Sequence, residues 1–252
     1  MRLEGRRALV TGAGSDGIGR AIARAFAREG ADVAVHYHSK PQVAAALVGE
    51  ITAMGRGSFA IQADLADAEV ARATVREAAK KLGGLDIIVT AAAAIYRKPI
   101  LEISDAEWDH MAALNVRGTF ACATEAARLM RRAGSGGRII MIGSVVQQIA
   151  LRGQVAYGAG KGAIAQLARG MALELAGAGI TVNVIAPGAT LTDFNRDQLS
   201  DPKVRASREA AIPIGRLASP EDMCAAAVFL ASPEAAYTTG VTIFVDGGAV
   251  LP

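Results

Sequence analysis

Short β-branched runs alternate with longer helical patterns along the whole 252-residue chain. Strands separated by helices of this length predict βαβ units and a parallel sheet, with right-handed crossovers that place helices on both faces. We therefore expect an α/β fold: a single Rossmann-type doubly wound domain, residues 1–252, with a seven-stranded parallel sheet. The expected strands are 8–11, 32–36, 58–62, 87–91, 138–142, 181–185 and 242–245, and the expected helices are 17–28, 41–54, 68–81, 107–133, 157–176 and 220–231.

The composition argues against several functional classes. The net charge of +3 is spread in short clusters rather than gathered into a basic stripe, so nucleic-acid binding is not expected. Two cysteines in helical patterns and three histidines without a cysteine cluster argue against a metal site. No apolar run approaches a membrane span, and the first residues show no signal-peptide pattern. We expect a cytoplasmic protein without a membrane partner.

The stretch 189–214 is the least regular part of the chain. It follows Pro187-Gly188 and contains Asp201-Pro202 and Pro213. Long segments without a strand or helix pattern are often lids over active sites, so we expect a functional loop here.

A glycine-rich loop joins the first expected strand to the first expected helix. In the run GAGSDGIGR, three glycines satisfy the G-x-G-x-x-G spacing and a fourth follows. In this context glycines allow a tight turn and let backbone N–H groups approach a pyrophosphate, which the helix N-terminus stabilises. The pattern favours a dinucleotide site over a merely glycine-rich turn. The contacts expected from this loop are Gly12, Gly14, Ser15, Asp16, Gly17, Ile18 and Gly19.

The end of the second strand bears on the type of dinucleotide. An NAD site places an acidic residue about 20 residues further on to hold the adenosine ribose, whereas Tyr37 stands in that position here. His38, Ser39 and Lys40 follow and can donate to a 2′-phosphate, although this segment could also be a solvated loop. We favour NADP over NAD, while the anionic Asp16 argues the other way.

Tyr157 and Lys161 lie four residues apart in the segment YGAGK, and Ser144 lies thirteen residues before Tyr157. Positions i and i+4 share one face of a helix, so the phenol and the ammonium can point into one pocket, unless they are a surface pair. A phenol has a reference pKa of about 10, and a neighbouring cation should lower it. Ser144 follows the apolar run RIIMIG, which places its hydroxyl at the carboxyl end of a strand, where open α/β sheets bind ligands.

These residues together resemble the short-chain dehydrogenase/reductase superfamily over essentially the whole chain. The resemblance is carried by the loop TGAGSDGIG at 11–19, NVRG around Asn115, Ser144, Tyr157 with Lys161, Pro187-Gly188 and the run DGG at 246–248. It implies a hydride transfer between NAD(P)(H) and an alcohol or carbonyl substrate.

The resemblance also implies a catalytic set of Asn115, Ser144, Tyr157 and Lys161. In this scheme Tyr157 exchanges the proton and Ser144 hydrogen-bonds the reacting oxygen. Lys161 holds the nicotinamide ribose and lowers the pKa of the phenol. Asn115 would position a water in a proton relay, or it is simply a capped or kinked helix position.

Further cofactor contacts follow from the same resemblance. Thr192 and the Gly188 backbone should hold the carboxamide. Asp64 either meets the adenine amino group or caps the next helix. The contacts expected beyond the glycine loop are Tyr37, His38, Ser39, Asp64, Leu65, Ala91, Tyr157, Lys161, Pro187, Gly188, Thr190 and Thr192.

Two stretches depart from the family pattern. The glycine loop is one residue longer than TGxxxGxG, so we expect a bulge between Gly12 and Gly17. The usual NNAG is replaced by TAAA at 90–93. Thr90 could keep one polar contact, and Ala93 requires an ordinary backbone conformation where the family has glycine.

The stretches HYHSK, DPKVRA followed by IPIGRLASPED, and FLASPEAAYTTGVTIFVDGG are similar to bacterial glucose 1-dehydrogenases. The last is also similar to 3-oxoacyl carrier-protein reductases. We expect a sugar or polyol dehydrogenase, with a 3-oxoacyl thioester or other ketone reductase and a non-catalytic dinucleotide-binding protein as alternatives. The resemblance implies a homotetramer. The substrate-facing candidates are Tyr96, Val146, Gln147, Gln154 and Phe194.

Overall fold

Seven parallel strands form one sheet in the order β3-β2-β1-β4-β5-β6-β7, in a computed structural model that describes residues 1–193, 195–196 and 198–251. This confirms the expected doubly wound α/β fold. The order reverses at β1, which pairs with both β2 and β4, and open sheets bind ligands at such a switch point. The strands are β1 Arg7–Val10, β2 Asp32–Tyr37, β3 Ser58–Gln62, β4 Ile87–Thr90, β5 Gly137–Ile142, β6 Ile180–Pro187 and β7 Thr242–Val245.

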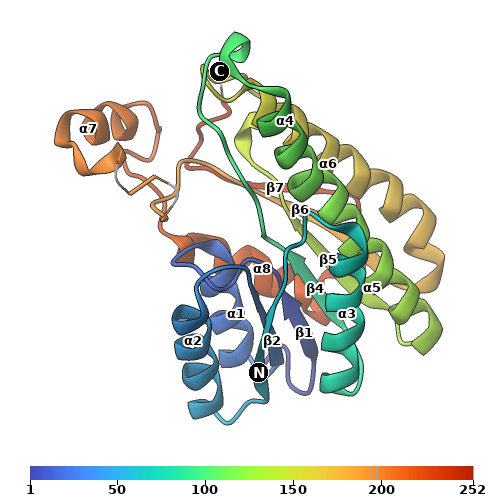
Figure 1. The fold of residues 1–252 in the computed structure, drawn as a ribbon. Coiled ribbons are helices and arrows are strands. Elements are labelled where there is room, and N and C mark those ends of the chain that lie inside the picture. The colour runs from blue at the N-terminus through green and yellow to red at the C-terminus, as the bar shows by residue number, and fades with distance from the viewer. Residues whose placement is uncertain (194, 197, 252) are drawn as a thin grey trace.

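Helices cover both faces of the sheet (Figure 1). One face carries α1 Ile18–Arg28, α2 Pro41–Ala53 and α8 Cys224–Ala231, packed over a core that includes Phe26 and Leu47. The other carries α3 Ala68–Leu82, α5 Thr119–Ala133 and α6 Val155–Leu175, over a core that includes Met130 and Met141, with α4 Asp105–Met111 beside α6. Because both faces are buried, the strands read as continuous apolar runs.

The expected element boundaries agree closely with the structure. β3 and β7 have the predicted bounds, and the other strands differ by one or two residues at one or both ends. The single helix expected over 107–133 is divided by a π-helical segment, Ala112–Gly118, and α8 is preceded by a 3₁₀ turn, Pro220–Met223.

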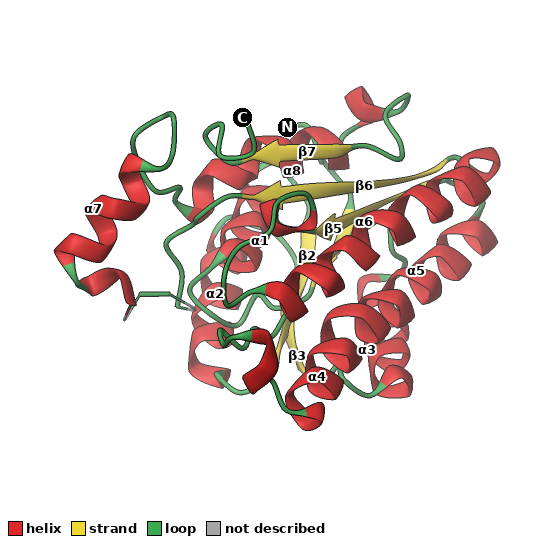
Figure 2. Ribbon diagram, turned by 90° about the horizontal axis from the view of Figure 1, so that it is seen from above, coloured by secondary structure: helices red, strands yellow, loops and turns green. Residues whose placement is uncertain are grey.

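The stretch expected to be an irregular loop contains a helix, α7 Pro202–Ala210. Asp201 caps it by accepting the Lys203 N–H at 2.8 Å, and Arg205 pairs with Glu209 one turn further on at 2.9 Å. No described residue of α7 is buried, and the helix stands away from the sheet (Figures 1 and 2). A single side chain of α7, the partly buried Val204, packs against the small cluster of Leu199, Ile212 and Leu217. So little apolar surface gives α7 little of the hydrophobic periodicity by which a sequence reveals a helix.

The side chain of His36, 2% exposed at the end of β2, ties two loops together. Its Nδ1 accepts the Gly12 N–H at 3.0 Å, and its Nε2 lies 3.1 Å from the Ala63 carbonyl oxygen. The proton must therefore lie on Nε2. Burial lowers the pKa of His36 to about 4, so the imidazole is neutral wherever the protein is folded near neutral pH.

Acid should destabilise the protein through His36. In the unfolded chain this histidine has a pKa of about 6.5, so it binds a proton at pH 5, whereas the folded chain keeps it neutral. Lowering the pH from 7 to 5 should therefore reduce the free energy of unfolding by about 2 kcal/mol. Urea denaturation at the two pH values measures this difference. His36→Asn should lower the free energy of unfolding and flatten its dependence on pH. Substitution of the exposed His38 should leave that pH dependence as in wild type. An equal pH dependence in His36→Asn would exclude this role.

Candidate active site

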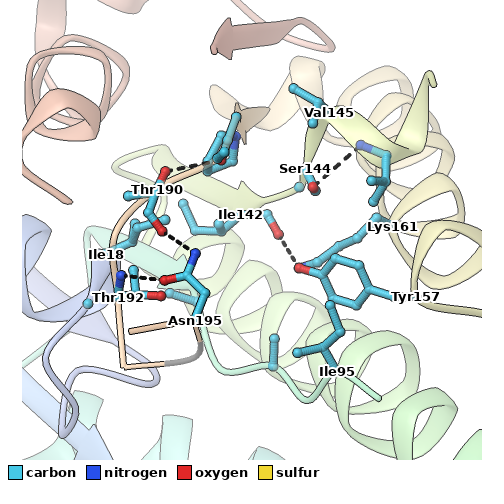
Figure 3. Close-up of a pocket in the computed structure, with 18 of the residues that line it drawn as sticks. Ile18, Ile95, Ile142, Ser144, Val145, Tyr157, Lys161, Thr190, Thr192 and Asn195 are labelled. Atoms are coloured by element: carbon cyan, nitrogen blue, oxygen red, sulfur yellow. Dashed lines mark hydrogen bonds between the residues drawn. The ribbon is translucent and has the colours of Figure 1, made fainter. Parts of the chain in front are cut away.

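One pocket follows the carboxyl edge of the sheet from the glycine loop to the start of α6 (Figure 3). It joins three of the four predicted catalytic side chains, those of Ser144, Tyr157 and Lys161, to most of the predicted cofactor contacts. The predicted residues in its wall are Gly12, Ser15, Asp16, Gly17, Ile18, Gly19, Ala91, Ser144, Val146, Gln154, Tyr157, Lys161, Pro187, Gly188, Thr190 and Thr192.

Tyr157 and Lys161 share the inner face of α6, as their spacing predicts. The Lys161 ammonium donates a hydrogen bond of 2.7 Å to the carbonyl oxygen of Ile142 at the end of β5. Its Nζ lies 5.4 Å from the centre of the Tyr157 ring. The lysine is 4% exposed, so its charge is held inside the protein by a backbone carbonyl and an aromatic face.

Burial sets the protonation of this pair. It raises the pKa of Tyr157 to about 12 and lowers the pKa of Lys161 to about 8. Desolvation outweighs nearby positive charge at Tyr157, and the Lys161 ammonium is hydrogen-bonded to Ile142. The lowering of the phenol pKa by Lys161 therefore stays a prediction. The charge that does oppose the shift of Tyr157 belongs to Arg97, which the sequence did not single out.

Ser144 follows β5 in an extended conformation and faces the same pocket. Its Oγ accepts a long hydrogen bond of 3.4 Å from the Val146 N–H, which leaves the hydroxyl proton to be donated to a ligand (Figure 3). Ser144 and Tyr157 can therefore both hydrogen-bond one oxygen atom that enters the pocket.

Gln147 is not part of the pocket wall, which corrects its assignment as a substrate-facing residue. Its Oε1 accepts the Ser144 N–H at 3.3 Å, and its Nε2 donates to the Thr242 hydroxyl at 3.4 Å. The side chain closes a capping box around the short 3₁₀ turn Val145–Gln147. Gln154 and Val146, by contrast, do line the pocket.

Tyr96 is also outside the wall. Its hydroxyl lies 3.1 Å from Nδ1 of His110, while its neighbours Ile95 and Arg97 line the pocket. Alternate residues of this extended segment therefore face opposite ways. Phe194 lies outside the described residues.

Asn115 occupies the π-helical segment between α4 and α5 and is 2% exposed. Its Oδ1 accepts the Ala94 N–H and its Nδ2 donates to the Ala94 carbonyl oxygen, both at 2.8 Å. The helix is irregular at Asn115, which agrees with the alternative of a kinked helix position, and π-turns are frequent at functional sites. The Asn115 side chain binds the loop after β4 and is not part of the pocket wall. Its role in a water relay stays a prediction.

Thr11 holds the stretch that replaces NNAG. Its Oγ1 accepts the N–H groups of Ala91 at 3.0 Å and of Ala92 at 3.2 Å. The expected polar contact of Thr90 is wrong, because its buried hydroxyl has no partner among the described residues. Gly12 packs against this stretch at φ +67°, where a Cβ would lie 2.7 Å from the Ala92 nitrogen. The position therefore requires glycine.

Most of the residues expected around the adenosine make contacts within the protein and lie outside the pocket wall. A Cβ at Gly14 would overlap the Tyr37 side chain, so these two residues pack against each other. Asp64 accepts the Ala66 N–H at 2.9 Å, and Asp67 rather than Asp64 caps α3. The capping alternative for Asp64 is therefore wrong, and its adenine contact stays a prediction. The predicted contacts outside the wall at this end are Gly14, Tyr37, His38, Ser39, Asp64 and the core residue Leu65.

Ion pairs tie the glycine loop to the segment after β6. Asp193 accepts the Asp16 N–H at 3.1 Å and pairs with Lys40 at 2.8 Å, and the Lys40 ammonium holds the pKa of Asp193 below its usual value. Arg196 pairs with the Asp16 carboxylate at 2.7 Å. The longer glycine loop thus places the Asp16 carboxylate against the segment after β6. Lys40, in turn, is already paired with an anionic side chain.

Asn195 is a site residue that sequence reasoning missed. Its Oδ1 accepts the Thr192 N–H at 3.0 Å and its Nδ2 donates to the Thr190 carbonyl oxygen at 2.8 Å (Figure 3). An asparagine three residues after Thr192 is the available signal, since such side chains commonly bind nearby backbone. The other missed wall residues are Ala93, Ala94, Ile95, Arg97, Ile142, Gly143, Val145, Leu151, Ala189, Leu199, Arg208 and Leu217.

Two further classes of site were considered. Within the described ranges, no three His, Cys, Asp or Glu side chains are grouped to hold a metal ion. In the part of the chain that the structure describes, no helix has the length and apolar character to span a membrane.

Comparison with known proteins gives a consistent picture. A family model described as enoyl-(acyl carrier protein) reductase matches residues 12–250. The chain is 41% identical to 3-oxoacyl-[acyl-carrier-protein] reductase of Staphylococcus aureus, covering 96% of this chain and 97% of the relative. It is 37% identical to L-rhamnose 1-dehydrogenase (NAD(P)(+)) of a Sphingomonas species, covering 98% and 96%. A candidate NAD(P)-dependent gluconate 5-dehydrogenase from Beutenbergia cavernae, solved with NADP at low occupancy, superposes with a TM-score of 0.93 at 38% identity, covering 99% and 98%.

Thr11 and Thr90 form a matched pair for mutation. Thr11→Val should cost about 1–3 kcal/mol, because two backbone N–H groups lose their acceptor. Thr90→Val should be neutral or stabilise the protein by about 1 kcal/mol, because it removes a buried hydroxyl without a partner. Denaturant unfolding of both variants measures the difference. A loss in Thr90→Val as large as that in Thr11→Val would contradict the hydrogen bonding described above.

Proposed function

The chain belongs to the short-chain dehydrogenase/reductase superfamily, and we propose that it transfers a hydride between NAD(P)(H) and an alcohol or carbonyl substrate. The observation that carries this proposal is the convergence of Tyr157, Lys161 and Ser144 on a pocket that continues to the glycine loop. These groups supply proton exchange and a hydrogen bond at one oxygen atom, which is what a carbinol or carbonyl centre needs.

The glycine loop fits the phosphates of a dinucleotide. The N-cap of α1 is Gly17, which has no side chain to bind the first N–H groups of the helix. These N–H groups and the positive end of the helix favour a pyrophosphate. When bound, the nicotinamide supplies the hydride acceptor or donor. The wall residues proposed to hold the cofactor are Gly12, Ser15, Asp16, Gly17, Ile18, Gly19, Ala91, Tyr157, Lys161, Pro187, Gly188, Thr190 and Thr192.

NADP is the proposed preference between the two dinucleotides. No acidic residue ends β2, where Tyr37 is followed by His38, Ser39 and Lys40. The Lys40 ammonium is paired with Asp193. A 2′-phosphate would therefore have to compete with the Asp193 carboxylate for this cation, and Asp193 is proposed to moderate the preference.

The proton chemistry is assigned to Tyr157. Burial keeps its phenol protonated at neutral pH, which suits donation to an oxygen in the reduction direction. Oxidation requires the phenolate and should therefore accelerate as the pH rises. Ser144 is proposed to stabilise charge on the same oxygen, and Lys161 to hold the ribose from within the pocket.

A sugar or polyol is the proposed substrate, supported by Gln154 in the pocket wall and by the rhamnose dehydrogenase relative. A 3-oxoacyl thioester reductase is the second candidate, because the Staphylococcus aureus relative carries that name. A purely dinucleotide-binding protein has less support, since the pocket retains Ser144, Tyr157 and Lys161 together.

Self-association is proposed from exposed apolar side chains on the helices beside the site. Trp108, Val155 and Leu173 are 45%, 51% and 84% exposed on α4 and α6. Burying such surfaces between copies would be favourable, which supports self-association. Light scattering tests whether the assembly is the homotetramer proposed here. Both cysteines are free thiols, which agrees with the cytoplasmic location proposed here.

Removing the Tyr157 hydroxyl should nearly abolish turnover. Tyr157→Phe is expected to lower kcat by about 10²- to 10⁴-fold, the usual contribution of a general acid–base group. NADPH binding, followed by its fluorescence, should weaken far less than turnover, because Tyr157 is one of many wall residues proposed to hold the cofactor. Tyr237→Phe is the matched control because that side chain is fully exposed. Unchanged turnover in Tyr157→Phe would exclude the assigned role.

Neutralising Asp193 should strengthen NADP binding. Asp193→Asn keeps an acceptor for the Asp16 N–H but frees the Lys40 charge, so the Kd for NADPH should fall by up to about fivefold, the worth of an exposed ion pair. The Kd for NADH should change less. The effect should vanish when Lys40→Gln is also present. Equal effects on both cofactors, or persistence without Lys40, would show that Lys40 does not read the 2′-phosphate.

A further inference from the structure

The side chain of Gln147 lies outside the pocket wall and binds the backbone of Ser144. Its Oε1 accepts the Ser144 N–H at 3.3 Å, and the Gln147 N–H in turn donates to the Ser144 carbonyl oxygen at 3.0 Å. Since a backbone N–H can only donate, the oxygen of the side-chain amide must face Ser144, which fixes the orientation of the amide. The turn that begins at Ser144 is therefore held by its own third residue.

The other end of the Gln147 amide reaches the edge of the sheet. Its Nε2 donates to the Thr242 hydroxyl at 3.4 Å, and Thr242 is the first residue of β7. Thr242 pairs in register with Val184 of β6. The amide thus connects the turn after β5 to a strand two places further along the sheet, which is a rigid support.

Close packing leaves this turn little room to shift. A Cβ at Gly143 would overlap the Gln147 Oε1 and would lie 2.7 Å from a methyl carbon of Val184. Glycine at position 143 therefore leaves the space that the Gln147 amide occupies. On α6, a Cβ at Gly158 would lie 3.0 Å from the Val146 carbonyl oxygen. The turn is packed against α6 as well as against the sheet.

The hydroxyl of Ser144 is only loosely held by the turn itself. Its Oγ accepts a long hydrogen bond of 3.4 Å from the Val146 N–H, and the Ser144 backbone is extended, with φ −170° and ψ 157°. A donor stabilises charge on a reacting oxygen best when it is in place beforehand. A displacement of about 1 Å in a site can cost about 10²-fold in rate. A contact that fixes the Ser144 backbone therefore bears on the rate.

We propose that Gln147, supported by Thr242, is a positioning residue that fixes the Ser144 hydroxyl for its hydrogen bond to the reacting oxygen. This inference rests on the proposed function and adds to its site a residue that does not touch the substrate. Because Gln147 acts through Ser144, its contribution to the rate should depend on the presence of the Ser144 hydroxyl.

A double-mutant cycle between Gln147 and Ser144 tests this dependence. Single-turnover rates separate hydride transfer from product release, and the probes are L-rhamnose with NADP, glucitol with NADP, and acetoacetyl-coenzyme A with NADPH. Ser144→Ala should lower the rate by about 10²- to 10³-fold. Gln147→Met keeps the length of the side chain without its amide and should lower the rate by about tenfold. In the Ser144→Ala background, the same substitution should change the rate by less than about twofold.

Two comparisons separate positioning from a general loss of structure. Thr242→Val should lower the rate by about two- to fivefold because the amide loses one of its two partners, whereas Thr242→Ser should keep most of the wild-type rate. Gln148→Met is the matched control, because Gln148 is the exposed residue next to Gln147, and it should behave as wild type. Neither Gln147 nor Thr242 lines the pocket, so the Kd for NADPH should stay at the wild-type value in their variants.

Amide exchange gives a readout that does not need turnover. Gln147→Met should accelerate deuterium exchange at the Ser144 N–H by about three- to tenfold, which is the worth of one hydrogen bond. Gln148→Met should leave this exchange rate unchanged.

The outcomes separate this inference from the proposed function. An equal rate loss from Gln147→Met with and without the Ser144 hydroxyl would overturn the inference and leave the oxidoreductase intact. Unchanged exchange at Ser144, or an equal rate loss in Gln148→Met, would do the same. No turnover of any probe by the wild type would overturn the proposed function and the catalytic part of this inference, whereas faster exchange at Ser144 would still support its structural part.

Discussion

Parallel pairing of β1 with β2 on one side and β4 on the other determines where this protein can act. All seven strands end at the same edge of the sheet, and the chain leaves β1 and β4 toward opposite faces. The loops after these two strands therefore diverge and leave a crevice. Segments as distant as the glycine loop, the start of α6 and the segment after β6 meet there.

Loops at that edge lack the hydrogen bonds of the sheet, and buried polar side chains supply them instead. Thr11 holds the stretch after β4, His36 holds the glycine loop, and Asn115 holds Ala94. The same enclosure gives the site its chemistry. Burial raises the pKa of Tyr157 and lowers that of Lys161, so the site holds a protonated phenol beside a cation that a backbone carbonyl stabilises.

Strands bounded by turn residues could be predicted closely from the sequence. β3 and β7 have the expected bounds, with Gly57 directly before β3 and the run DGG directly after β7. α7 could not be predicted because only Val204 packs against the small cluster beside it, and its other contacts are an N-cap and an ion pair. The π-helical segment around Asn115 could not be predicted, because the apolar pattern of the flanking helices continues through the segment. The hydrogen bonds between Asn115 and Ala94 set its local geometry.

The sequence by itself determined the fold class, the glycine loop and the set of Ser144, Tyr157 and Lys161, because periodicity and fixed spacing carry that information locally. Only the tertiary structure decided which way side chains face and which charges meet. It turned Gln147 toward the backbone of Ser144, paired Lys40 with Asp193 and brought Arg97 and Arg208 to the pocket. These contacts join residues whose separation in the chain carries no pattern, and their strength depends on burial, which exists only once the chain has folded.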